Sequence, residues 1–298
     1  MIICSLFLLV LLLFCPSIAI AGSRYGATLW LTELLPTLLP FFIAIRLFQY
    51  SLPKAAGKRV FLLTGLLCGY PVGASLVTYQ YDRNLLSREA AYFYLGFVNN
   101  PSPMFVLVFC GKTVLGLSTG ESLSLFGILV LSSLAGSLLF RFLYHGISCS
   151  KRISSVPSKK KQPLSFAPAS VKSPSEVLDS IILDSFRVMI NIGGYVILFS
   201  ILGQLIHAIF PESSVFSLFG CGIMEISSGA SYLKISTLQI VYKKALILVI
   251  LSFGGLSAAF QTSSILTRSE LNLLPYLLNK SLNSIIAGIT ALLLFRMF

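Results

Sequence analysis

Glycine and proline interrupt the long apolar runs of this chain, and these interruptions limit the folds that it can adopt. The stretch 66–75 carries Gly69, Pro71 and Gly73 inside an apolar run. Proline removes a backbone donor and glycine adds conformational freedom, so a regular helix breaks here. In hydrocarbon, such a break survives only where protein or a water-filled cavity satisfies the freed backbone groups. We therefore expect the break to lie in the interior of a membrane protein.

A second interruption, 225–231, follows in the other half of the chain. The letters Gly-Ala-Ser at 73–75 recur at 229–231, and in the same alignment the break at 99–101 falls on 255–257. Interrupted segments at corresponding places in two halves of a membrane protein indicate a duplicated fold with a transport site between the repeats. We expect the two interruptions to face each other.

The composition places the chain in the membrane class. Only 11% of its residues are charged, against about 25% in soluble domains. The Lys and Arg residues that give the net charge of +12 lie mostly between apolar runs, where they set topology. No basic patch is interleaved with aromatic residues, so we predict no nucleic-acid binding. The predicted fold is an all-α polytopic membrane protein in contact with the lipid bilayer.

No sequence motif indicates catalysis or a cofactor. Five of the six cysteines lie in apolar runs, and the set has neither metal-ligand spacing nor the pattern of a disulfide framework. The Walker, HExxH and GxSxG motifs do not occur. We therefore expect neither an enzyme nor an ATP-driven pump, and we expect no cofactor and no metal site.

Four regions are expected along the chain. They are an N-terminal transmembrane helix at 1–27, a first repeat at 28–145, a basic linker at 146–176 and a second repeat at 177–298. A cleaved signal is the alternative for the first region, but its start carries no Lys or Arg, which favours an uncleaved helix. The first repeat is expected to open with a span at 28–50, in which Trp30 is an interfacial anchor. The linker is rich in Ser, Pro and Lys, and it is predicted to be cytoplasmic.

Two topologies are consistent with the interrupted segments. If each segment crosses the bilayer, each half has four spans and the repeats are parallel. If each segment dips in and returns, each half has three crossings and the repeats are inverted. We favour re-entrant hairpins, because the basic residues on both sides of the first interruption then share the cytoplasmic side with the linker. The basic residues around the second interruption fit this arrangement less well.

The polar groups at the interruptions form the expected substrate-binding site. Broken helices expose backbone groups near the midplane, and their N-terminal ends suit the carboxylate or phosphate of an anionic solute. Hydroxyl and amide side chains add donors and acceptors. The expected site comprises Gly69, Tyr70, Pro71, Gly73, Ser75, Asn99, Asn100, Ser102, Glu225, Ser227, Ser228, Gly229, Ser231, Gly254, Gly255, Ser257 and Gln261.

Glu225 is the only acid well inside an apolar run. A carboxylate in such a position is costly and marks a functional site by default. Three roles stay open at this point: it binds a cation, it takes up a proton and couples transport to protons, or it caps the broken helix as a structural group.

Several stretches together resemble a known family. They are 38–43, 68–74 with 88–90, 97–105, 193–194 with 199–202, 224–229, and 252–257 with Gln261. In these residues the chain resembles the YlbJ family of sporulation integral membrane proteins, within the nucleoside-recognition or Gate-domain superfamily. The resemblance covers roughly residues 28 to 295 and, through relatives such as the concentrative nucleoside carriers, implies inverted repeats with re-entrant hairpins.

The same resemblance implies a function in endospore formation. It implies a multi-pass protein of the mother-cell-derived membrane that moves dipicolinate, a small aromatic dianion, toward the forespore. The sequence and the resemblance thus predict a membrane transporter of a small anionic solute, dipicolinate in particular, with proton or cation coupling. Two alternatives stay open: a nucleoside carrier and a non-transporting scaffold of the sporulation membrane.

Overall fold

The fold was analysed in a computed structural model, which describes residues 6, 9–10, 12–51, 58–150, 173–210 and 215–297. The start of the predicted first helix and residues 151–172 of the predicted linker lie outside these ranges. The predicted linker is shorter at both ends than expected, because α7 extends to Ser150 and α8 begins at Pro174. Ser173 and Glu176 form a reciprocal capping box that fixes this start.

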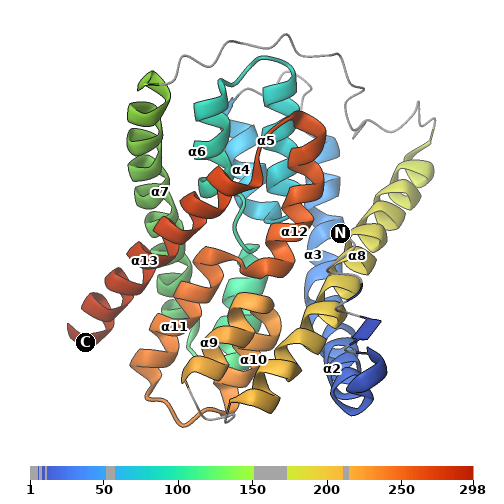
Figure 1. Cartoon of the computed structure of the whole chain (residues 1–298). Coiled ribbons are helices and arrows are strands. Elements are labelled where there is room, and N and C mark those ends of the chain that lie inside the picture. The colour runs from blue at the N-terminus through green and yellow to red at the C-terminus, as the bar shows by residue number, and fades with distance from the viewer. Residues whose placement is uncertain are drawn as a thin grey trace.

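The described chain is helical, and its elements follow a similar order in the two halves (Figure 1). The first half contains α2 (Pro16–Leu29), η1 (Trp30–Leu34), α3 (Leu35–Ser51), α4 (Lys58–Cys68), α5 (Val72–Asp82), α6 (Arg88–Val98), η2 (Phe105–Val114) and α7 (Thr119–Ser150). The second half contains α8 (Pro174–Ile209), α9 (Val215–Met224), α10 (Ile226–Ile235), α11 (Ile240–Phe253), α12 (Gly255–Leu266), η3 (Thr267–Ser269) and α13 (Leu273–Met297). Each half therefore has a pair of short helices, an interrupted helix and a long last helix; the predicted duplication itself stays a prediction.

Long helices enclose the short ones. Helices α3 and α8 pack together on one side of the molecule, α7 and α13 pack together on the other, and the interrupted segments lie between them (Figure 1). The pair α4 and α5 lies toward the upper end of this view, whereas α9 and α10 lie toward the lower end. The buried apolar core runs through η2, α9, α10 and α11.

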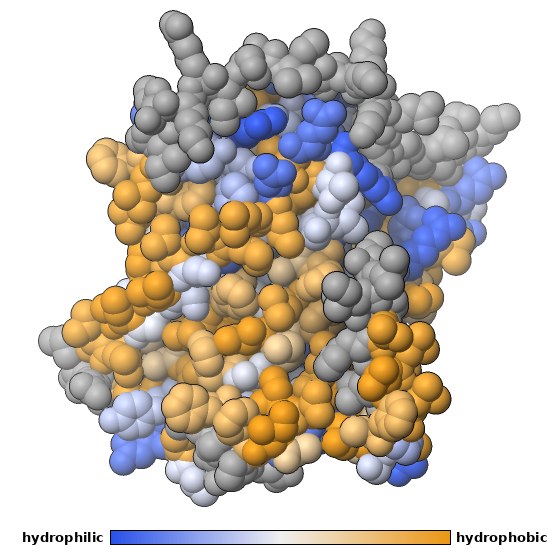
Figure 2. Space-filling model, in the orientation of Figure 1, coloured by the Kyte–Doolittle hydropathy of each residue, from blue (hydrophilic) through white to orange (hydrophobic). Residues whose placement is uncertain are grey.

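The predicted class of all-α polytopic membrane protein is confirmed. Within the described residues, five helical stretches are long and apolar enough to cross a membrane: Pro16–Phe48, Thr119–His145, Pro174–Ile209, Ile240–Ser269 and Leu273–Phe295. Apolar residues cover most of the face in Figure 2, and hydrophilic residues gather toward its upper and lower ends. A bilayer matches this distribution, because hydrocarbon accepts an apolar band and water accepts the ends.

The boundary expected between the first helix and the span at 28–50 is wrong, since α2, η1 and α3 form one continuous helix. Its turn widens to a π-helix at Trp30–Leu34, directly before Pro36. A proline ring clashes with the carbonyl four residues earlier, and a wide turn relieves that clash without ending the helix. Trp30 is held by a neighbouring helix, because its Nε1 donates to the Met189 carbonyl at 3.0 Å.

Both interrupted segments fold back on themselves as helical hairpins. In the first, Gly65 of α4 and Gly73 of α5 both lie against Val98. A Cβ added at Gly65 would lie 3.0 Å from a Val98 side-chain atom, and one added at Gly73 would lie 2.9 Å from the Val98 carbonyl oxygen. In the second, a Cβ on Gly229 would lie 2.3 Å from the Gly222 Cα. Residues on opposite arms can approach this closely only if the arms run side by side.

Candidate functional site

A cavity of about 40 Å³ lies where the interrupted segments of both halves meet the long helices. Its lining residues are Leu34, Leu38, Phe42, Cys68, Tyr70, Pro101, Ser102, Phe105, Ile192, Val196, Glu225, Ile226, Ser227, Gly254, Ser257, Ala258 and Gln261. The side formed by α3 and α8 is apolar, and the polar groups come from the interruptions. A cavity with this lining can hold a solute that has an apolar body and a polar end.

Seven of the predicted site residues line this cavity. They are Tyr70, Ser102, Glu225, Ser227, Gly254, Ser257 and Gln261. They come from four separate interruptions, two in each half, which the fold brings together at one place. The Tyr70 hydroxyl oxygen is buried and has no hydrogen-bond partner within the described residues.

Glu225 caps the second interruption. It is the N-cap residue of α10, its side chain is buried, and its Oε2 accepts a hydrogen bond from the Ser228 N–H at 2.6 Å. A carboxylate suits this position because the first N–H groups of a helix have no partner within the helix. Glu225 thus has the capping role; the roles in cation or proton binding stay predictions. It forms no ion pair with a described Lys, Arg or His side chain.

Asn99 joins three elements and does not line the cavity. Its Nδ2 donates to Thr262 Oγ1 at 3.1 Å and to the Tyr276 hydroxyl at 3.0 Å, and its Oδ1 accepts from the Ala74 N–H at 3.1 Å. The sequence placed this amide in the binding site, but here its donors and acceptor are used inside the protein. Asn99 therefore links the first interruption to α12 and α13.

Asn100 binds a residue that the sequence analysis missed. Its Oδ1 accepts from Lys280 Nζ at 2.7 Å and from Ser133 Oγ at 3.3 Å, while its Nδ2 donates to the Phe97 carbonyl at 2.7 Å. Lys280 is fully buried in α13. An ionisable residue in an otherwise apolar span is the signal in the sequence that could have identified it.

Lys280 belongs to a buried polar stripe along α13. Asn279 donates to the Tyr92 carbonyl at 2.9 Å, and Asn283 donates to the Gly96 carbonyl at 3.0 Å. Spacings of three and four place these residues on one helix face. The stripe joins α13 to α6.

Backbone contacts join the first interruption, at 66–75, to the break that follows Val98. Gly69 has a φ of +66°, and an added Cβ would lie 2.7 Å from the Asn100 carbonyl oxygen and from the Ser102 amide nitrogen. The Tyr70 N–H donates to the same carbonyl at 3.1 Å. Pro71 is the N-cap residue of α5 and accepts from the Ser75 N–H. Glycine at 69 is therefore needed for both conformation and close approach.

The remaining predicted residues pack around the second interruption. Ser228 Oγ lies 2.8 Å from Ser200 Oγ of α8, and Ser231 is hydrogen-bonded to Tyr25. Gly255 has a φ of +73° and would place a Cβ 3.3 Å from the Gly222 carbonyl oxygen. The cavity therefore does not collect the whole predicted set, and these side chains contact their neighbours instead.

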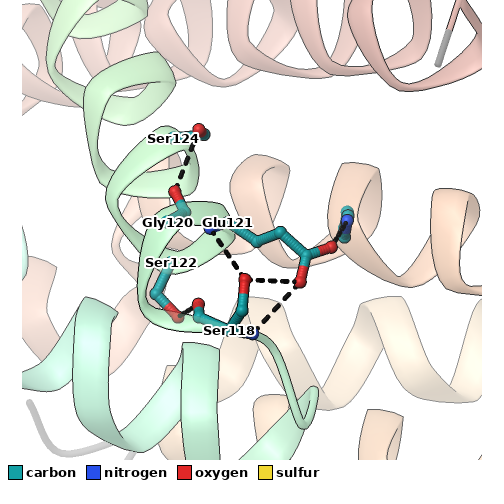
Figure 3. A network of polar contacts seen from close by, with 6 residues as sticks. Ser118, Gly120, Glu121, Ser122 and Ser124 are labelled. Atoms are coloured by element: carbon teal, nitrogen blue, oxygen red, sulfur yellow. Dashed lines mark hydrogen bonds and ion pairs between the residues drawn. The ribbon is translucent and has the colours of Figure 1, made fainter.

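Several charged groups at the edges of the molecule form ion pairs. Glu121 Oε2 accepts from the N–H and the hydroxyl of Ser118 at 3.1 and 2.9 Å (Figure 3), and its Oε1 pairs with Lys244 Nζ at 2.8 Å. Among the described residues, no group of three His, Cys, Asp or Glu side chains could hold a metal ion. The buried Lys280 and Glu225 form no ion pair within the described residues.

Comparison with known proteins identifies a relative. No family model and no solved structure matches the chain. The chain is 25% identical, over an alignment 327 positions long, to the sporulation integral membrane protein YlbJ of Bacillus subtilis (strain 168), and the alignment covers 94% of this chain and 78% of that protein. With candidate spans distributed over both halves, similarity along nearly the whole sequence supports the chain's membership of the YlbJ family of integral membrane proteins.

Proposed function

We propose that this protein transports a small anionic solute across the membrane and binds it in the cavity between the interrupted segments. The observation that carries the proposal is that polar groups from four helix breaks, including Tyr70 and Glu225, converge on one cavity inside the helices. Discontinuous helices at a repeat interface form the substrate sites of many secondary transporters. A scaffold would have no use for such a costly arrangement.

The cavity fits a closed form of a transport cycle. A volume of about 40 Å³ holds only a few water molecules. A solute the size of an aromatic carboxylate needs the apolar wall of α3 and α8 to move away from the interrupted segments. Such relative motion of two helix groups around a fixed site is the usual basis of alternating access.

Glu225 gives a physical reason for proton coupling. An anion in the cavity brings a second negative charge close to this buried carboxylate, and two like charges in one site disfavour each other. Protonation of Glu225 removes that repulsion. We therefore propose that one proton enters with the anion, which makes an inwardly directed proton gradient drive uptake.

The substrate proposed is dipicolinate, in a membrane that takes part in sporulation. The relative is by name a sporulation protein, and the family resemblance implies dipicolinate. An aromatic ring matches the apolar wall that includes Phe42 and Phe105, and its carboxylates match the polar side. The nucleoside carrier and the non-transporting scaffold are the competing functions.

Uptake by reconstituted vesicles tests this proposal. Vesicles that contain the purified full chain should accumulate labelled dipicolinate, faster with an acidic exterior, and excess uridine should not compete. Glu225→Gln should abolish the response to the proton gradient, whereas the matched change Glu121→Gln at the edge should retain it. Competition by uridine would favour the nucleoside carrier, and no uptake of either solute would favour the scaffold.

A further inference from the structure

We infer that Lys280 provides the positive charge that recognises the solute's carboxylate, with the Tyr70 hydroxyl as a second donor. This inference rests on the proposed function, because it assigns a recognition group to the same cavity. It also specifies the ligand as a carboxylate attached to an apolar body.

Lys280 is buried with neutral partners alone. Its Nζ donates to Asn100 Oδ1 at 2.7 Å and to the Asn99 carbonyl at 3.4 Å. It forms no ion pair with any carboxylate in the described part of the chain. An ammonium group has three donors, so one remains available for a further acceptor. The contacts hold the cation in place but do not neutralise it.

The end of the Lys280 side chain lies beside the cavity. Gly254 lines the cavity, and a Cβ added there would be 3.7 Å from Lys280 Cε and 3.6 Å from Tyr70 Cε1. The Lys280 side chain and the Tyr70 ring therefore meet at the same glycine. Gly254 has a φ of +92°, which favours glycine and so keeps this position free of a side chain.

Tyr70 adds a donor at the same place. Its ring lines the cavity, and its hydroxyl oxygen is buried without a partner among the described residues. A buried hydroxyl without a hydrogen bond is unfavourable. A carboxylate in the cavity would accept from this hydroxyl and would lie close to the ammonium group of Lys280.

The Asn100 side chain does not depend on a lysine at position 280. Asn100 Oδ1 has another donor, Ser133 Oγ at 3.3 Å, so this acceptor keeps a partner when the lysine is replaced. Burial of a charge without an opposite charge beside it is costly, so we expect an apolar side chain of similar volume at this position to preserve stability. Because a cation buried inside a membrane-spanning helix costs stability, its presence there indicates a functional role.

The rest of the lining sets the class of ligand. Leu34, Phe42 and Val196 form an apolar wall that suits an aromatic or aliphatic body. Glu225 lies on the polar side, so a second ionised carboxylate is disfavoured unless that residue is protonated. A neutral isostere of the carboxylate lacks the charge that Lys280 would bind.

Ligand-induced thermal stabilisation of the purified full chain in detergent tests the inference. Benzoate and dipicolinate should raise the melting temperature of the wild-type protein, and the neutral isostere benzamide should not. Lys280→Met should weaken carboxylate binding by roughly 30-fold or more, while the unliganded protein melts at or above the wild-type temperature. The matched control Lys244→Met removes a charge paired with Glu121 and should bind benzoate like the wild type.

A second variant keeps the test decisive if Lys280→Met does not fold. Tyr70→Phe removes only a hydroxyl that has no protein partner, and it should weaken benzoate binding about tenfold with an unchanged melting temperature. Equal binding of benzoate and benzamide by the wild type would overturn the inference, as would unchanged benzoate binding by either variant. Carboxylate binding that depends on Lys280, without uptake by wild-type vesicles, would support the inference and overturn the transporter.

Discussion

The two halves interrupt their helices at similar places, but they stabilise the interruptions with different groups. In the first half, neutral amides and backbone groups join the breaks: the Tyr70 N–H donates to the Asn100 carbonyl, and the Ala74 N–H donates to the Asn99 side chain. In the second half, the carboxylate of Glu225 caps α10. The first half thus uses neutral groups at its junction, and the second places an ionisable group at the cavity.

This difference separates residues that stabilise the fold from residues that could act on the solute. The amides of the first half have their hydrogen bonds satisfied inside the protein, so they fix the relative positions of α5, α6, α12 and α13. Glu225 keeps a titratable group at the cavity, and the end of the Lys280 side chain lies beside Gly254 of the cavity lining. We expect changes at the first junction to affect stability most and changes at Glu225 to affect transport most.

The largest expected effect on stability is at Asn99. Asn99→Ala removes hydrogen bonds to Ala74, Thr262 and Tyr276 and leaves their buried groups without this partner. We expect a loss of about 4 kcal/mol in the free energy of unfolding, measured by unfolding in detergent micelles. The exposed Asn272 provides the control, because Asn272→Ala should cost less than about 0.5 kcal/mol. Similar losses for both variants would contradict a junction role for Asn99.

The second hairpin should tolerate no added atom where its arms touch. Gly229→Ala places a Cβ 2.3 Å from the Gly222 Cα, so the arms must separate, and we expect a cost of about 3 kcal/mol. Gly194 of α8 has nothing within 4 Å of an added Cβ, and Gly194→Ala should stabilise by up to about 1 kcal/mol. The melting temperatures of the two variants measure this difference in stability. A neutral Gly229→Ala would show that α9 and α10 do not pack as a hairpin.

Glu225 should matter less for stability than for transport. Glu225→Ala removes the cap of α10 and should cost about 1 kcal/mol, whereas Glu225→Gln retains an acceptor for the Ser228 N–H and should melt close to the wild type. Thermal unfolding of the two variants measures this difference. If both variants are as unstable as Asn99→Ala, the carboxylate is a structural group like the amides of the first half.

The smallest effect is expected at the edge of the first half, where Glu89 pairs with Arg141 at 2.8 Å and with His145 at 3.0 Å. The Arg141 hydrogen bond, with a further contribution from His145, lowers the pKa of Glu89. A carboxyl group with a lowered pKa stabilises the fold at pH values above its pKa in the unfolded chain, about 4.3. This contribution is lost as the pH falls through the pKa of the group in the folded protein. Because the pair is partly exposed, Glu89→Gln should cost only about 0.5 kcal/mol at neutral pH. Melting curves should show the difference shrinking below about pH 4; a difference that grows there would contradict the ion pair.

The sequence predicts the interruptions well because their signals are local. Glycine, proline and asparagine alter the backbone wherever they occur, so the breaks at Gly69, Asn99 and Gly254 can be recognised without any tertiary information. The cap at Glu225 follows from the same reasoning. In contrast, the continuous helix through Trp30 could not be anticipated, because a wide turn absorbs the effect of the following proline.

The sequence predicts less well which residues form the site, because the packing of distant segments determines this. Asn99 and Asn100 carry the right groups for binding a solute, yet the fold turns them toward Thr262, Tyr276 and Lys280. Lys280 reaches Asn100 and the neighbourhood of the cavity because α13 packs against α6. Its charge in an apolar span was a readable signal, but its neighbours come from parts of the chain that are distant in sequence.

Protection of a cavity thiol by the solute tests the central claim most directly. In a background without native cysteines, Ser257→Cys places a thiol in the cavity lining, and Ser124→Cys places one on the exposed surface of α7. If the cavity binds the solute, dipicolinate should slow the reaction of N-ethylmaleimide at position 257 and leave the rate at position 124 unchanged. Equal rates at position 257 with and without dipicolinate would contradict the claim that solute occupies the space between the two interruptions.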